Sequence, residues 1–165
     1  MEILIFSDSH GNVHPMLRVI KEHPRATHVL FCGDGVKDLD DVEACFPHLI
    51  LLGVRGNCDF FGCDAYPYER ELTLGGLHIL MMHGHTHGTK GGYGAAVAYA
   101  GREGFDLLFC GHTHVALDTR YEVGERHLHV FNPGSIGKIE EGCYHYGVLT
   151  LRDNGYLLSH GIVRA

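Results

Sequence analysis

Short apolar runs alternate with amphipathic stretches over the first third of the chain. Residues 2–6, 28–32 and 49–54 are mainly apolar runs of β-forming residues, and each is followed by a polar, glycine-containing loop. Between them, residues 15–22 and 39–46 repeat apolar positions with the period of a helix. This order predicts a β-α-β-α-β unit whose continuous apolar strands belong to a sheet covered on both faces.

Two dipeptides mark hairpins in the second half. Gly75-Gly76 separates two strand-like segments and predicts a two-residue turn. Asn154-Gly155 separates the last two segments and is expected to supply the positive φ angles of a type I′ turn. Antiparallel pairing is therefore expected to take over in this half.

The remaining segments complete an α/β pattern. Residues 88–94 are glycine-rich and predict either a lid or a plain connection. We expect an alanine-rich helix over 95–102, a buried strand over 105–110 and a hairpin over 117–131. No linker, repeat or low-complexity tract interrupts the pattern, so a single domain over residues 1–165 is expected.

Composition narrows the functional classes. The chain has 20 acidic and 13 basic residues and a net charge of −7, which argues against an extended nucleic-acid groove. Its six cysteines lack paired CxxC spacing, so neither a zinc ribbon nor a disulfide framework is expected. No apolar segment approaches membrane-spanning length. These features predict a cytoplasmic protein with no membrane partner. Because the chain as a whole is acidic, any anionic substrate must be attracted by positive charge at its binding site.

Potential metal ligands follow every strand of the predicted core sheet: Asp8, His10, Asp34, Asn57, His83, His112 and His114. Residues i and i+2 of an extended chain point the same way, so Asp8 with His10, and His112 with His114, are each expected to face one cavity. The mixed oxygen and nitrogen donors suit borderline divalent ions. They are too many for one tetrahedral ion, whereas two ions about 3.5–4 Å apart would use them all.

The segments "SDSHGN", "CGDG", "RGNCD", "MMHGH" and "CGHTH" occur in this order over nearly the whole chain. Together they resemble the motifs D-x-H, G-D, G-N-H-D/E, H and G-H-x-H of the calcineurin-like metallophosphoesterases. The small bacterial and archaeal phosphodiesterase branch is most similar, because it commonly carries Cys in the third motif and a late "NPGS", here residues 132–135. The resemblance implies two packed mixed β-sheets, a β-sandwich, flanked by helices.

The resemblance also implies how the ligands are shared. One ion would be held by Asp8, His10, Asp34 and His114. The other would be held by Asp34, Asn57, His83 and His112. Asp34 would bridge two divalent ions, with Mn²⁺ favoured and Ni²⁺, Fe²⁺, Zn²⁺ or Co²⁺ as alternatives.

The tetrapeptide "GHTH" occurs twice, at 84–87 and 111–114. Aligning the strand ends makes His83 the ligand of the first segment, because it follows the apolar strand directly. His85 is then expected to contact substrate or support the ligands, as is Asn12. His87 is expected to be an ordinary loop histidine.

The implied activity is hydrolysis of a small phosphodiester by attack of a metal-bound hydroxide. Asn57, Cys58 and Asp59 are the catalytic candidates. Cys58 stands where many relatives have a histidine that protonates the leaving alkoxide, and Asp59 where they have the residue that orients it. A thiol donates a proton but carries transition-state charge poorly, so good leaving groups such as aryl esters are expected to react best.

Three alternatives remain. The same fold serves as a protein-binding scaffold in a retromer subunit with a degraded metal site, whereas all seven ligands are intact here. A phosphomonoesterase or a nucleotide pyrophosphohydrolase would differ only in substrate. Family members often form homo-oligomers, but the sequence does not indicate which surface would form the interface.

Overall fold

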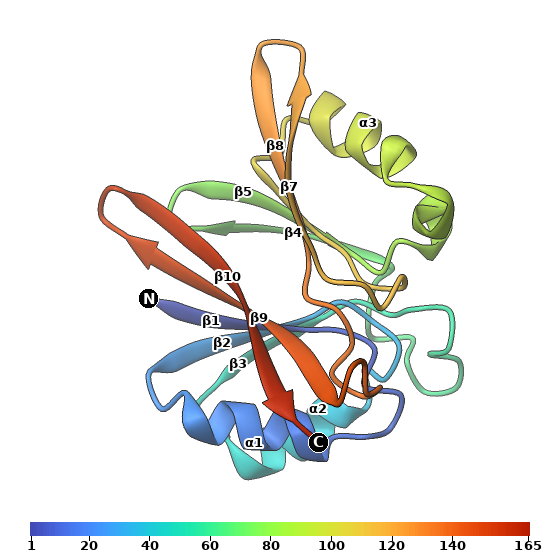
Figure 1. Ribbon diagram of the computed structural model, residues 1–165, viewed down its shortest axis with the longest axis vertical. Coiled ribbons are helices and arrows are strands. Elements are labelled where there is room, and N and C mark those ends of the chain that lie inside the picture. The colour runs from blue at the N-terminus through green and yellow to red at the C-terminus, as the bar shows by residue number, and fades with distance from the viewer.

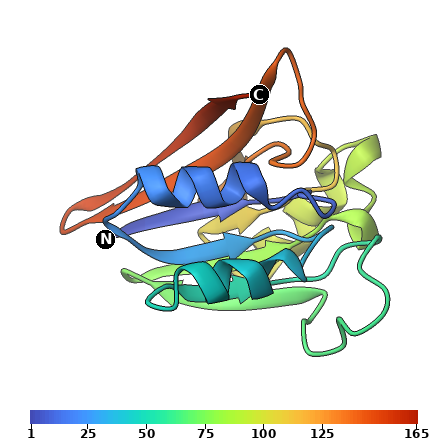
Figure 2. The same ribbon diagram turned by 90° about the horizontal axis from the view of Figure 1, so that it is seen from below.

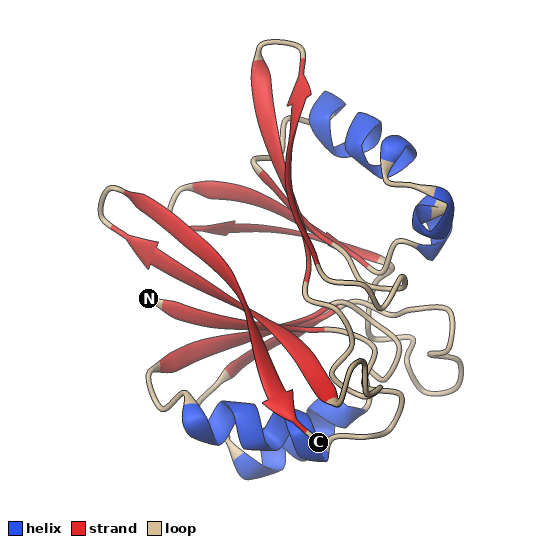
Figure 3. Ribbon diagram, viewed as in Figure 1, coloured by secondary structure: helices blue, strands red, loops and turns tan.

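Two five-stranded β-sheets pack face to face and carry helices on their outer faces (Figures 1 and 3). The computed structural model describes all 165 residues. The strands are β1 (Glu2–Phe6), β2 (Ala26–Phe31), β3 (Ile50–Gly53), β4 (Glu69–Leu74), β5 (Leu77–Met82), β6 (Leu107–Phe109), β7 (Leu117–Val123), β8 (Arg126–Asn132), β9 (Cys143–Arg152) and β10 (Gly155–Arg164). The helices are α1 (His14–Glu22), α2 (Asp38–Cys45) and α3 (Gly94–Arg102), with 3₁₀ turns at His85–His87 and Thr89–Gly91. This α/β arrangement is the predicted fold class.

The first sheet has the strand order β10-β9-β1-β2-β3. Its β1-β2 and β2-β3 pairs are parallel, as the β-α-β-α-β pattern predicts, and the β9-β10 hairpin adds to β1 in antiparallel fashion. Helices α1 and α2 lie side by side on its outer face (Figure 2). Met16 and Val19 of α1 are buried against this face in one cluster with Leu4 and Phe6. The apolar stripe of α1 therefore fixes the loop between β1 and α1 over one end of the sheet.

The second sheet has the order β4-β5-β6-β8-β7 and is mixed. The outer pairs β4-β5 and β7-β8 are antiparallel, but the central pairs β5-β6 and β6-β8 are parallel. The expectation that antiparallel pairing takes over is wrong for this centre, because α3 crosses over between β5 and β6 and returns the chain in the same direction. Ile5, Phe109 and Phe131 belong to the apolar cluster between the two sheets.

The two glycine turns differ from each other. Gly75 and Gly76 have φ angles of 58° and 80°, so the predicted two-residue turn is confirmed. In the last hairpin Gly155 pairs with Arg152, which makes Asp153 and Asn154 the central residues. Asn154 is not among the residues with positive φ, and the type I′ turn about Asn154-Gly155 is wrong. Gly155 alone takes positive φ, at 135°, because it has no Cβ.

The strands β1, β2, β3, β5, β6 and β8 all have their carboxyl ends at one end of the sandwich, where the long loops gather (Figure 3). All seven candidate ligands lie in these loops. None of the helices has the length and apolar character needed to cross a membrane.

Candidate metal centre

Five of the candidate ligands have a left-handed backbone. The φ angles are 57° at Asp8, 49° at His10, 60° at Asp34, 68° at His112 and 62° at His114. The expectation that the i, i+2 pairs converge on an extended chain is therefore wrong, because alternate left-handed residues turn both side chains inward. Such a conformation costs roughly 1–2 kcal/mol for each non-glycine residue. The chain thus concentrates backbone strain where its chelating side chains meet.

Asp8, His10 and His114 form the first group, with one potential ligand atom of each within 4.8 Å of the others. Asp8 Oδ1 lies 3.1 Å from His114 Nε2 and 3.8 Å from His10 Nε2, and the two imidazole nitrogens are 3.3 Å apart. Asp8 Oδ2 accepts hydrogen bonds from the Ser7 hydroxyl at 2.5 Å and the His112 amide at 3.0 Å. Oδ1 is buried and has no hydrogen-bond partner. This oxygen is a free acceptor aimed at two imidazoles.

Asp34, His83 and His112 form the second group. The buried His83 ring uses Nδ1 to donate to the Cys32 carbonyl at 2.7 Å, which leaves the lone pair of Nε2 facing the cavity. Nε2 lies 3.3 Å from Asp34 Oδ2 and 3.2 Å from Asn57 Oδ1. Three acceptors facing one another at these distances require a proton or a cation between them.

Most of these side chains have pKa values that favour the deprotonated form, which is the form that binds a cation. Burial lowers the pKa of His112 to about 4, with the neighbouring His83 and Lys90 acting in the same sense, and burial also lowers the pKa of His10. Burial likewise acts to lower the pKa of His83, but the Asp34 and Asp8 carboxylates outweigh it and raise that pKa. For Asp34, burial opposes ionisation, yet the adjacent His83 ring and the hydrogen bond from the Cys58 amide hold the pKa of its carboxyl well below its usual range.

Asp34 belongs to a third group as well, with His10 and Cys58. The sequence predicts Cys58 only as a proton donor, whereas its thiol also lies close enough to His10 and Asp34 to be a potential metal ligand. The signal was present, since Cys58 follows Asn57 in the same loop beyond β3. Burial and the adjacent Asp34 raise the pKa of this thiol, so it stays protonated at neutral pH.

Asp59 braces two loops rather than orienting the side chain of Cys58. Its Oδ2 accepts hydrogen bonds from the amides of Asp34 and Gly56, both at 2.8 Å. Its Oδ1 accepts from the amides of Gly35 at 2.8 Å and Val36 at 3.1 Å. Because four backbone amides donate to this carboxylate, Asp59 holds the loop after β2 against the loop after β3.

The late "NPGS" segment hydrogen-bonds to the backbone beside the ligands of the first group. The Ser135 hydroxyl donates to the Asp8 carbonyl at 2.8 Å, and the Asn132 amide donates to the Gly111 carbonyl at 2.8 Å. Asn12 is not brought into the three groups. Its side chain donates to the Gly137 carbonyl at 3.2 Å, in a segment that itself bonds to Asp8.

The two histidines of the first "GHTH" are separated by the structure. The His85 ring centre lies 5.4 Å from that of His83 and 6.1 Å from that of His112, and its Nδ1 is buried without a partner. His87 instead packs on Tyr99, with ring centres 5.1 Å apart. His85 therefore borders the second group, and His87 does not. Thr89, in the glycine-rich segment that follows, is buried and donates to the Gly84 carbonyl.

The residues present fit two divalent cations. The unpartnered Asp8 Oδ1 and the acceptors around His83 Nε2 each mark a position that a cation would satisfy. Asp34 belongs to the second group and, with His10 and Cys58, to the third group, and His10 is shared with the first. The donors are carboxylate oxygens and imidazole nitrogens, which suit borderline divalent ions.

Several known proteins are similar to this chain in sequence or in fold. The chain is 36% identical over 138 residues to "Probable metallophosphoesterase YsnB" of Bacillus subtilis, covering 82% of this chain and 75% of that protein. A solved archaeal phosphodiesterase superposes with a TM-score of 0.73 at 22% identity, covering 99% and 100% of the two chains. Vps29 of Entamoeba histolytica, solved with Zn²⁺, gives 0.74 at 20% identity and 99% coverage of both. The profile described as "Calcineurin-like phosphoesterase superfamily domain" matches residues 1–154, and the chain belongs to this superfamily.

Proposed function

We propose that the chain is a metal-dependent phosphodiesterase that binds two divalent ions, preferentially Mn²⁺, and hydrolyses small phosphodiesters. The observation that carries this proposal is the pair of His/Asp groups linked by the group of His10, Asp34 and Cys58, with the buried Asp8 Oδ1 left without a donor. The archaeal phosphodiesterase among the solved structures and the B. subtilis relative support the assignment.

Asp8, His10, Asp34 and His114 would hold one ion, and Asp34, Asn57, His83 and His112 the other. Two divalent ions held there supply Lewis-acid polarisation of a phosphoryl oxygen and of the attacking water. The protein contributes fixed geometry: Ser7 and the His112 amide hold Asp8, the Cys32 carbonyl holds His83, and the Cys58 amide holds Asp34 at 2.7 Å.

Cys58 is the proton donor to the leaving group in this proposal. Its thiol is exposed beside His10 and Asp34, and its raised pKa keeps the proton on sulfur at neutral pH. A neutral thiol stabilises developing negative charge less well than a cationic imidazolium does, so turnover depends strongly on the acidity of the leaving group.

The test is hydrolysis of bis-p-nitrophenyl phosphate by chelator-stripped protein with added Mn²⁺, Ni²⁺ or Zn²⁺, with bound metal counted by mass spectrometry. We expect activity to return as occupancy approaches two ions per chain. The Asp34→Asn variant should lose both the activity and the bound metal. The exposed His127→Asn on β8 is the matched control. Faster turnover of p-nitrophenyl phosphate would assign a phosphomonoesterase instead, and an inactive protein with trace metal would favour a scaffold.

A further inference from the structure

Two adjacent phenylalanines are exposed beside the candidate metal centre. Phe60 is 71% exposed and Phe61 is 91% exposed, whereas the other six phenylalanines are buried or half-buried. Both follow Asp59, whose carboxylate is clamped by four backbone amides. The start of their loop is therefore fixed against the centre, and the rings remain in solvent. Exposing two aromatic rings is unfavourable unless something binds them.

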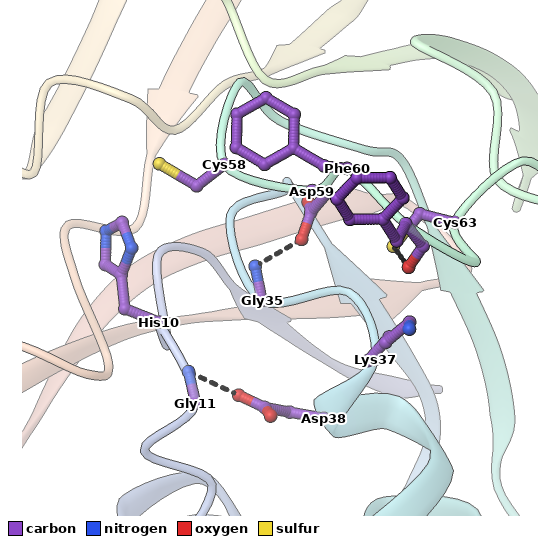
Figure 4. Close-up of a pocket in the computed structure, with 10 residues that line it drawn as sticks. His10, Gly11, Gly35, Lys37, Asp38, Cys58, Asp59, Phe60 and Cys63 are labelled. Carbon is purple, nitrogen blue, oxygen red and sulfur yellow. Dashed lines mark hydrogen bonds between the residues drawn. The ribbon is translucent and has the colours of Figure 1, made fainter.

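The rings border a pocket of about 440 Å³ that also contacts the metal centre. His10 and Cys58 line it, and both belong to the group that includes Asp34. In Figure 4 these two side chains lie on one side of the pocket and Lys37 lies on the other. This volume is in the range of small-molecule sites. A group attached to a phosphate at the centre would enter the pocket directly.

The charges around the pocket suit an anionic substrate. Asp38 accepts hydrogen bonds from the Ser9 hydroxyl at 2.6 Å and the Gly11 amide at 3.1 Å, and the Asp59 carboxylate is fully engaged. Lys37 reaches over the aromatic loop, because a Cβ built on Gly62 would lie 2.8 Å from its Nζ. No carboxylate lies within 4 Å of Nζ. Lys37 is therefore a lining charge that no carboxylate pairs, and it is available to an anionic group.

We infer that Phe60 and Phe61 bind an aromatic ester group of the phosphodiester, with its phosphate at the metal centre. The inference rests on the proposed function and narrows its substrate class to phosphodiesters that carry a flat aromatic ring. Ring stacking on phenylalanine tolerates different ring systems, so the pocket selects for aromaticity rather than for one hydrogen-bonding pattern.

Phenylphosphonate and methylphosphonate separate this inference from catalysis, because they share a head group, resist hydrolysis and differ in the ring. Their affinities for the Mn²⁺-loaded protein would be measured by calorimetry. We expect phenylphosphonate to bind roughly tenfold more tightly. The F60A/F61A variant should lose this preference and keep its methylphosphonate affinity, whereas F60Y/F61Y should retain the preference. Ile162→Ala, which alters an exposed apolar residue of β10, is the control.

The outcomes distinguish the pocket from the reaction. If F60A/F61A keeps the preference while bis-p-nitrophenyl phosphate is hydrolysed, the aromatic site is wrong and the phosphodiesterase assignment stands. If the preference depends on the two rings but no diester is cleaved, the site stands and the reaction is wrong. If neither phosphonate binds the metal-loaded protein, the aromatic site is wrong, and hydrolysis of bis-p-nitrophenyl phosphate decides the reaction separately.

Discussion

Asp8 Oδ1 lies 3.1 Å from His114 Nε2 in the interior and receives no hydrogen bond, although the other oxygen of the same carboxylate receives two. A buried acceptor without a donor costs about 1–3 kcal/mol. The metal-free fold therefore bears a local cost at Asp8 that a bound cation would remove.

Asp8→Asn is expected to stabilise the metal-free protein and abolish its response to metal. The amide oxygen can still accept from Ser7 and His112, while the amide nitrogen donates toward the imidazole nitrogens. We expect the free energy of unfolding in chelator to rise by about 1 kcal/mol. Added Mn²⁺ should raise the Tm of the wild type and leave that of the variant unchanged. The exposed Asp40→Asn is the control, and a metal-dependent Tm shift in Asp8→Asn would contradict the proposed ligand role.

His112 should make the metal-free protein lose stability in acid. Its pKa in the folded state is about 4, below the ordinary value of 6.5, so between these values the unfolded chain binds a proton that the folded chain does not. The contribution is present above pH 6.5 and is lost as pH falls toward 4. His83, with a raised pKa, contributes in the opposite sense: its stabilisation is present below pH 6.5 and is lost as pH rises through the folded value.

His112→Asn isolates this effect. We expect the fall in Tm of the metal-free protein between pH 7 and pH 4.5 to be smaller in His112→Asn than in the wild type. His127→Asn, on the exposed end of β8, is compared in the same buffers. An unchanged pH profile in His112→Asn would show that the folded protein does not resist protonation at this position.

Asp59→Asn should destabilise the protein. An amide offers one accepting oxygen to the four backbone amides that the carboxylate now satisfies, so we expect a loss of about 2–4 kcal/mol in urea unfolding, with weaker metal binding at Asp34. Asp41→Asn, exposed on α2, should change little. A large loss of kcat with unchanged stability would instead indicate that Asp59 acts on Cys58.

The order of strands and the residues at their carboxyl ends could be predicted from the sequence. Apolar runs and helical periodicity are local signals, and the ends of parallel strands must meet at one edge of a sheet. That is why Asp8 and Asp34, which follow neighbouring parallel strands of the first sheet, could be grouped although they are far apart along the chain. The motif resemblance then extended the grouping to His83 and His112, which follow strands of the second sheet.

Backbone and loop geometry could not be predicted in the same way. Left-handed Asp8 and His114 have the same sequence signature as extended residues, because their conformation is imposed by the surrounding hydrogen bonds. The four amides on Asp59 come from two loops that approach only after β2 and β3 pair. The parallel β6-β8 pair depends on a crossover that periodicity does not encode.

Gly111→Ala tests how tightly the first group is held. A Cβ on Gly111 would lie 2.7 Å from Asp8 Oδ2 and would clash with Ser7 Oγ, the two atoms that fix the carboxylate. We expect a loss of about 1–3 kcal/mol in stability and a weaker affinity for one of the two ions, measured by calorimetry. Gly91→Ala is a matched control, because a Cβ there meets nothing within 4 Å and its φ is not positive. Equal metal affinity in both variants would rule out steric support of Asp8 by Gly111.

Cys58→His tests the leaving-group argument. An imidazolium at this position would donate a proton and become a neutral imidazole, whereas the thiol, whose pKa burial and Asp34 raise, is a poor donor in a transition state that develops charge. With the methyl and p-nitrophenyl esters of one phosphodiester series, we expect turnover of the methyl leaving group to rise at least about tenfold and that of p-nitrophenolate to change little, because p-nitrophenolate departs without protonation. Loss of both activities at full metal occupancy, or an equal change in both, would show that position 58 does not protonate the leaving group and that its thiol serves the ions near His10 and Asp34 instead.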